Sequence, residues 1–139
     1  MTKGRAAEDA ALWLVLPGER PVSWNKFYAG MHWRQRSQIK RDVGWAVRAA
    51  VLEAGELAPF TRPVSILIVA YCKGQQLDPD NVTAKLYIDA LKHAGLFADD
   101  TPAYIDVVST RVKKDNDHPR VEIVVREQQR DEIGGKDDA

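Results

Sequence analysis

Apolar residues recur along the chain with different spacings, and each spacing predicts a different kind of element. Between residues 37 and 54 they recur every three or four positions, as at Val43 and Val47, which is the pattern of an amphipathic helix. Residues 82–94 are apolar over a wider arc, which predicts a second helix that is mostly buried. Residues 64–71 form a nearly continuous, β-branched run, and this run predicts a central strand that is covered on both faces.

Three shorter apolar segments complete the predicted sheet. Residues 11–16 form a first strand, and residues 104–113 and 120–126 read as two strands that form a hairpin around a turn. The order is therefore β-α-β-α-β-β, which predicts a small single α/β (α+β) domain with a mixed sheet of about four strands and two main helices. We expect this domain to occupy residues 10–128.

The composition is typical of a folded cytoplasmic protein. Of the 139 residues, 45% are hydrophobic and 29% are charged. Cys72 is the single cysteine, so an intrachain disulfide and a cysteine-based zinc cluster are excluded. No apolar run is long enough to span a bilayer and no signal peptide is evident, so no membrane partner is expected. Residues 1–9 and 129–139 are charged or contain glycine, which predicts flexible tails.

The formal net charge is zero, but the charges are unevenly distributed along the chain. Residues 20–48 contain seven basic residues and one acidic residue, whereas residues 77–106 contain six acidic and two basic residues. A basic surface beside an acidic pocket suits a metal-dependent nuclease, although a solvated helix face gives the same pattern. Residues 21–36 have no clean period and predict a loop, which either stacks on bases or is pinned to the core by its aromatic residues. The candidate DNA-binding residues are Lys26, Arg34, Arg36, Lys40 and Arg41.

Candidate catalytic residues gather at the two ends of the second predicted helix. Asp78 and Asp80 precede it, Asp100 follows it, and Lys85 lies about one turn inside it. Carboxylates that converge on one point repel each other unless a cation lies between them, and oxygen ligands favour Mg²⁺ or Mn²⁺ over zinc. Such ions support the hydrolysis of phosphodiester bonds.

Geometry and ordinary turn chemistry leave alternatives open. The helix is roughly 20 Å long, and the chain from Ala94 to Asp100 reaches at most about 20 Å. Asp100 therefore returns to the helix start only if this segment runs straight back, or a second subunit supplies the carboxylate. The structural alternative is that Asp80 or Asn81 caps the helix and that Asp99 caps a loop instead of serving as an extra ligand.

Five short motifs follow one another in a fixed order over more than twenty residues: Asp78-Pro79-Asp80-Asn81, Lys85, Asp89-Ala90-Leu91, Ala94-Gly95-Leu96-Phe97 and Asp99-Asp100. This combination resembles the signature of the RusA family, which are small homodimeric Holliday junction resolvases of bacteria and their phages. The resemblance implies a Mg²⁺-dependent endonuclease that acts in DNA recombination and repair, with Mn²⁺ as a possible substitute. It also implies a homodimer, a four-way DNA junction as the substrate, and a bacterial or phage origin.

The resemblance assigns roles to individual residues. It implies that Asp78, Asp80 and Asp100 bind the metal ion and are essential for catalysis, and that Lys85 is a functional lysine. In the family pattern the lysine follows the asparagine by three residues, whereas Lys85 follows Asn81 by four. Lys85 is therefore either the functional lysine or an i,i+4 partner of Asp89.

Two other functions stay open. One is a catalytically inactive protein that binds branched DNA, which is consistent with the changed position of Lys85. The other is a small interaction protein whose acidic motif has only a structural role.

Overall fold

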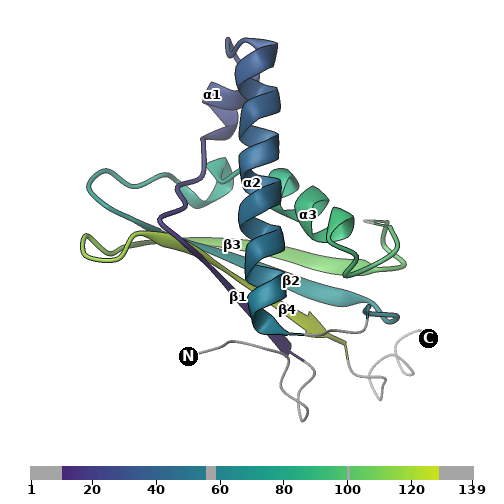
Figure 1. The fold of residues 1–139 in the computed structure, drawn as a ribbon. Coiled ribbons are helices and arrows are strands. Elements are labelled where there is room, and N and C mark those ends of the chain that lie inside the picture. The colour runs from purple at the N-terminus through teal and green to yellow at the C-terminus, as the bar shows by residue number, and fades with distance from the viewer. Residues whose placement is uncertain (1–10, 56–58, 100, 129–139) are drawn as a thin grey trace, which may run out of the picture.

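A four-stranded sheet carries two long helices on one face (Figure 1), in a computed structural model that describes residues 11–55, 59–99 and 101–128. The elements are β1 (Ala11–Pro17), α1 (Trp24–Tyr28), α2 (Trp33–Ala54), β2 (Val64–Cys72), the 3₁₀ helix η1 (Pro79–Asn81), α3 (Ala84–His93), β3 (Ile105–Lys114) and β4 (Arg120–Glu127). Apart from the short α1 and η1, this confirms the predicted α+β class and element order. The expected tails, 1–9 and 129–139, lie outside the described residues.

Strand β2 lies inside the sheet, with β3 on one side and β4 on the other. The strand order is β1-β4-β2-β3, in which β2 pairs with β3 in parallel and with β4 antiparallel. The predicted hairpin of β3 and β4 is therefore wrong, because β2 separates them. The connection between them passes the end of β2, where the Asp115 amide donates to the Cys72 carbonyl at 2.9 Å and the Gly74 amide donates to Asn116 Oδ1 at 3.0 Å.

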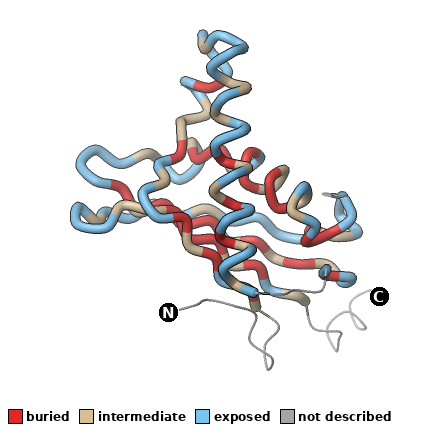
Figure 2. Tube along the Cα trace, in the orientation of Figure 1, coloured by how far each residue is buried: buried red, intermediate tan, exposed pale blue. Residues whose placement is uncertain are grey.

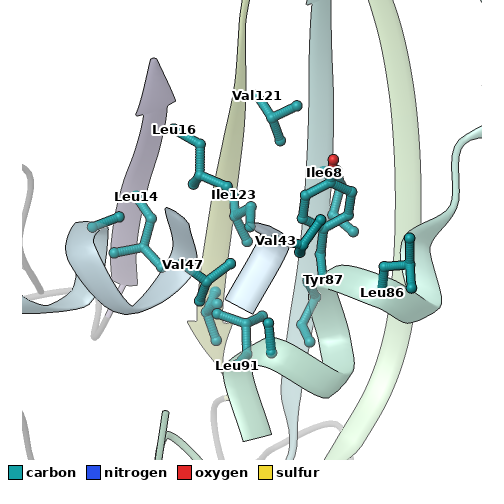
Figure 3. Packing of buried hydrophobic residues seen from close by; sticks show 14 of the residues in the cluster. Leu14, Leu16, Val43, Val47, Ile68, Leu86, Tyr87, Leu91, Val121 and Ile123 are labelled. Atoms are coloured by element: carbon teal, nitrogen blue, oxygen red, sulfur yellow. The ribbon is translucent and has the colours of Figure 1, made fainter. Parts of the chain in front are cut away.

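The hydrophobic core lies between the sheet and the two long helices. Leu14 of β1 is opposite Ile123 of β4, which is in turn opposite Ile68 of β2, and all three are at most 1% exposed. Figure 3 shows side chains from these strands and from both helices pointing into one cluster. The buried side chains of α2, Val43, Val47 and Ala50, recur with the predicted helical spacing.

The other face of the sheet carries no helix. Both long helices lie on the same side (Figure 1), so among the described residues the prediction that β2 is covered on both faces is wrong. On the open face Trp13 remains 43% exposed, and its Nε1 donates to Glu122 Oε1 at 2.9 Å. Arg120 Nε donates to the other oxygen of Glu122 at 2.7 Å, so this buried carboxylate is paired on both oxygens.

Helix α2 begins four residues earlier than predicted. His32 occupies the N-cap position, and its Nδ1 accepts a hydrogen bond from the Arg34 amide at 3.1 Å. Residues 21–36 were predicted to form a loop. Much of this range is helical instead, because it contains the start of α2 and the whole of α1, which follows its N-cap residue Ser23. No helix in the described part of the chain is both long and apolar enough to cross a bilayer.

A buried hydrogen bond ties the segment after β1 to helix α3. The Tyr87 hydroxyl donates to Glu19 Oε2 at 2.8 Å, and Tyr87 is fully buried. Burial raises the pKa of the Glu19 carboxyl above its ordinary value of 4.5; the bond from Tyr87 lowers this pKa, and the charge of Asp42 raises it. The net effect is a raised pKa, so the folded state favours the protonated carboxyl.

Replacing Ile123 with alanine is expected to destabilise the fold by about 2–5 kcal/mol, because a fully buried side chain leaves a cavity in the middle strand pair. Urea unfolding measures this change. Leu52→Ala is the control, since Leu52 is 74% exposed on α2 and its truncation should cost less than about 0.5 kcal/mol. Equal losses in the two variants would contradict this description of the core.

The raised pKa of Glu19 predicts a specific pH dependence. Because the folded protein binds this proton more tightly than the unfolded chain, the Glu19 contribution to stability is largest below pH 4.5 and falls as the pH rises through the raised folded pKa. Glu19→Gln removes this contribution. The free energy of unfolding of the variant, compared with that of the native protein at the same pH, should therefore be lowest at acidic pH and rise toward neutral pH. Urea titrations over this range test it, with the exposed Glu53→Gln as control. Parallel pH profiles for Glu19→Gln and the native protein would refute the assignment.

Candidate functional site

The acidic turn, residues 78–81, connects the end of β2 to helix α3. It contains the 3₁₀ helix η1, in which the Asn81 amide donates to the Asp78 carbonyl at 2.9 Å. The hydroxyl of Thr110 on β3 donates to the Pro79 carbonyl at 2.6 Å, which fixes the turn over the sheet. Asp78 and Asp80 are both exposed, so the turn presents two carboxylates at the surface.

A segment from the first part of the chain lies beside the acidic turn. Ser23 and Val82 form an isolated antiparallel bridge, and the Asn25 amide donates to Asn81 Oδ1 at 3.3 Å. The hydroxyl of the fully buried Thr83 donates to the Val22 carbonyl at 3.0 Å. Three contacts therefore hold residues 22–25 against residues 81–83, although more than fifty positions separate them along the chain.

Basic side chains border a hollow next to this junction. The hollow has a volume of about 550 Å³, and its lining includes Arg20, Lys26 and Leu77, the residue that precedes Asp78. Arg20 Nη2 also donates to the Gln75 carbonyl at 3.0 Å, which holds the loop after β2 close to the hollow. The hollow is thus lined by two basic residues and by Leu77, the residue that directly precedes the acidic turn.

The carboxylates of Asp78 and Asp80 have no ion-pair or hydrogen-bond partner among the described residues. Neither residue caps α3, because that helix begins at Ala84 and Thr83 holds its N-cap position. The prediction that Asp80 or Asn81 caps the helix is therefore wrong. Two exposed, unpaired carboxylates separated by one residue fit the oxygen ligands that Mg²⁺ prefers. These two residues are therefore available to a metal ion.

The third predicted metal ligand, Asp100, lies outside the described residues. Its neighbour Asp99 is exposed, and Asp99 Oδ1 lies 3.9 Å from Lys92 Nζ. Lys92 belongs to the last turn of α3, whereas the acidic turn precedes the first. Among residues 11–55, 59–99 and 101–128, no group of three or more His, Cys, Asp or Glu side chains is close enough to hold a metal ion.

Lys85 lies in the first turn of α3 and is exposed. Its Nζ is 3.6 Å from Asp89 Oδ2, so the i,i+4 pair that the sequence allowed is present. Val82 and Thr83 are not helical, with ψ angles of 132° and 70°. The segment between Asn81 and Lys85 therefore contains two residues that precede the helix, and α3 begins at Ala84.

The predicted DNA-binding residues lie on α1 and on the first half of α2. Lys26 is exposed on α1, and Arg34, Lys40 and Arg41 are exposed on α2, while Arg36 is half-buried. This half of α2 has no buried residue before Val43, and it rises away from the sheet (Figures 1 and 2). Lys26, Arg34 and Arg36 are thus helical and not part of the predicted loop, whereas Lys40 and Arg41 lie on the helix as predicted.

The prediction from sequence did not include Trp45. Its side chain is 68% exposed on α2, and the Arg48 guanidinium lies 6.0 Å from the centre of its ring. A signal for it was present, because Trp45 lies outside the buried stripe of the helix and one turn from an arginine. At such a position a large aromatic side chain is placed at the surface and does not contribute to the core.

Neither a comparison with models of known protein families nor one with curated protein sequences gives a match to this chain. The resemblance to the RusA family stays a prediction, and the function is inferred from the residues and their arrangement.

Proposed function

We propose that this protein is a metal-dependent endonuclease that cleaves branched DNA. The observation that carries the proposal is the junction between residues 22–25 and residues 81–83. It holds the segment that runs from Arg20 to Lys26 against the residues that follow Asp78 and Asp80, whose carboxylates are unpaired among the described residues. A nuclease needs both groups, because cations bind the phosphate backbone and carboxylates hold the ion at the scissile bond. Neither carboxylate accepts a capping hydrogen bond, although Asp78 occupies the N-cap position of η1, and this supports a functional role for both residues.

Each group has a defined task in this proposal. Asp78 and Asp80 bind Mg²⁺, with Mn²⁺ as a possible substitute, and Asp100 completes the predicted set. The bound ion supplies an activated water and neutralises charge at the phosphate. Arg20 and Lys26, on the edge of the hollow, orient the DNA backbone through its phosphates. Lys85 supplies a further positive charge, once the phosphate competes with Asp89 for its ammonium group.

We further propose that the active form is a homodimer that binds a four-way junction. Resolving such a junction requires two matched nicks, and two copies related by a two-fold axis supply two equivalent sites. A second copy also offers a way to bring a third carboxylate to the acidic turn. In the described chain, Asp99 is engaged by Lys92 at the opposite end of α3 from that turn.

A second candidate function is a protein that binds branched DNA without cleaving it. The observation that favours this alternative is the contact of Lys85 Nζ with Asp89 Oδ2 at 3.6 Å, since a lysine paired within its own helix is partly neutralised. In this case the basic residues of α1 and α2 bind DNA, and the acidic turn has no catalytic task.

Asp78→Asn and Asp80→Asn should each reduce Mg²⁺-dependent nicking of a labelled four-way junction by at least about 100-fold, because several kcal/mol of charge stabilisation are lost. Asp117→Asn is the matched control, since Asp117 is an exposed aspartate in the turn before β4. Paired nicks in both strands are read on a denaturing gel. Cleavage by the native protein that persists in both variants would refute the proposed metal site.

Lys85→Ala separates the two candidate functions. If Lys85 stabilises charge during cleavage, the nicking rate should fall at least about tenfold while junction affinity in EDTA changes little. If Lys85 only pairs with Asp89, both quantities should stay unchanged, and the loss of stability should be a few tenths of a kcal/mol. A gel shift without nicks in Mg²⁺ or Mn²⁺ for the native protein would favour the binding protein over the nuclease.

A further inference from the structure

A groove runs between helices α2 and α3, on the side of these helices that faces away from the sheet. It has a volume of about 350 Å³. On α2 it is lined by one helical stripe, which comprises Lys40, Arg41, Gly44, Trp45 and Arg48. On α3 it is lined by a second stripe, which comprises Leu86, Asp89, Ala90, His93 and Ala94. Spacings of three and four residues place each stripe on one face of its helix.

The charges around this α2–α3 groove favour an anionic ligand. Lys40, Arg41 and Arg48 contribute three cations, against the single carboxylate of Asp89. That carboxylate is already paired with Lys85 at 3.6 Å. Within the described ranges, neither Lys40 nor Arg48 has an ion-pair partner, so their charges remain available to a ligand.

The lining of the groove also offers a flat apolar surface. The ring of Trp45 is 68% exposed although the helix that carries it packs against the core, and Arg48 lies 6.0 Å from its centre. An exposed tryptophan next to arginine is an arrangement on which nucleic-acid bases stack.

Gly44 leaves the groove open between these groups. It lies inside a helix, where glycine is less stable than alanine by about 1 kcal/mol. A Cβ atom built at this position has no other atom within 4 Å, so packing within the described chain does not require a glycine here. The missing side chain instead allows a ligand to approach the helix backbone between Trp45 and the lysine and arginine residues.

We propose that the α2–α3 groove binds one unpaired nucleotide of a DNA strand, with its base on Trp45 and its phosphates at Arg48, Lys40 and Arg41. This inference rests on the proposed function for the choice of DNA as the ligand. The volume is at the lower end of the range for ligand pockets and admits a nucleotide but not a duplex. Branched DNA offers such nucleotides where strands exchange. Asp89, the partner of Lys85, lines this groove, and Lys85 lies in the first turn of α3, which follows the acidic turn after Val82 and Thr83.

The test measures DNA binding in EDTA by fluorescence anisotropy, with a labelled four-way junction and a labelled single strand of thymidines. Trp45→Ala should weaken binding of both probes about tenfold or more, the effect found for the loss of one base–aromatic stack. Gly44→Gln should weaken binding while it raises the melting temperature, because glutamine fills the groove and forms helix better than glycine. Lys73→Ala and Leu52→Ala are controls, since both residues are exposed and lie outside the groove lining.

A spectroscopic signal adds a second readout. Single-stranded DNA should quench the tryptophan fluorescence of the native protein, and Trp45→Phe should remove most of this quenching while Trp33→Phe retains it. A stable Gly44→Gln variant with native affinity for both probes would overturn the nucleotide site. Loss of binding together with a change of oligomeric state in sedimentation would also overturn it, because a second copy would then occupy the groove.

Nicking in Mg²⁺ distinguishes this inference from the proposed function. If the groove variants bind DNA with native affinity and nick the junction normally, the nucleotide site is overturned and the nuclease proposal stands. If the native protein does not nick the junction but the groove variants bind DNA more weakly than it does, the nucleotide site is supported and the nuclease proposal is overturned. A native protein that binds neither DNA probe overturns both.

Discussion

Strand β2 pairs with a parallel neighbour on one side and an antiparallel neighbour on the other, and the rest of the arrangement depends on this pairing. A parallel partner forces the chain to return from the end of β2 to the start of β3, and it does so through helix α3. The acidic turn lies between β2 and this helix along the chain, and Thr110 of β3 holds it over the sheet, so Asp78 and Asp80 are presented beside β3.

The acidic turn alone would be a loop with two exposed charges, and its chemical interest comes from what lies against it. The bridge between Ser23 and Val82 and the bond from Thr83 to Val22 connect the turn to a segment that precedes α1. Thr83 is fully buried, and a buried hydroxyl without a hydrogen-bond partner would destabilise the fold. The bond to Val22 is therefore favoured by folding itself. A requirement of folding thus brings the segment that carries Arg20 and Lys26 to the residues that follow the acidic turn.

Hydrophobic periodicity predicted the class of the fold and most of its elements, because Val43, Val47 and the apolar residues of the strands carry clear spacings of about four and two. It did not predict which strands pair, since the apolar pattern of a strand does not depend on which other strand lies next to it. The early start of α2 was missed because residues 33–36 contribute no fully buried side chain, and because its N-cap is His32 instead of the usual Ser, Thr, Asp or Asn.

For the candidate site, the sequence indicated Asp78, Asp80 and Lys85 through their order and spacing, but not what faces them. Spacing along one segment says nothing about residues that fold against it from another part of the chain. The contact of Asn25 with Asn81 and the groove beside Trp45 are of this kind, since each joins residues from distant parts of the chain. Such contacts follow from the sheet topology, which local patterns do not determine.

Helix α2 contributes one stripe of residues to the hydrophobic core and a different stripe to the proposed nucleotide site. Its stripe at Val43, Val47 and Ala50 faces the sheet, whereas the stripe that contains Gly44 and Arg48 is rotated by about 100° from it. Alanine at position 44 would stabilise the helix by about 1 kcal/mol relative to glycine, and Trp45 lies outside the buried stripe. The proposed nucleotide site accounts for both residues, because a base stacked on Trp45 needs the open helix surface that Gly44 leaves beside it.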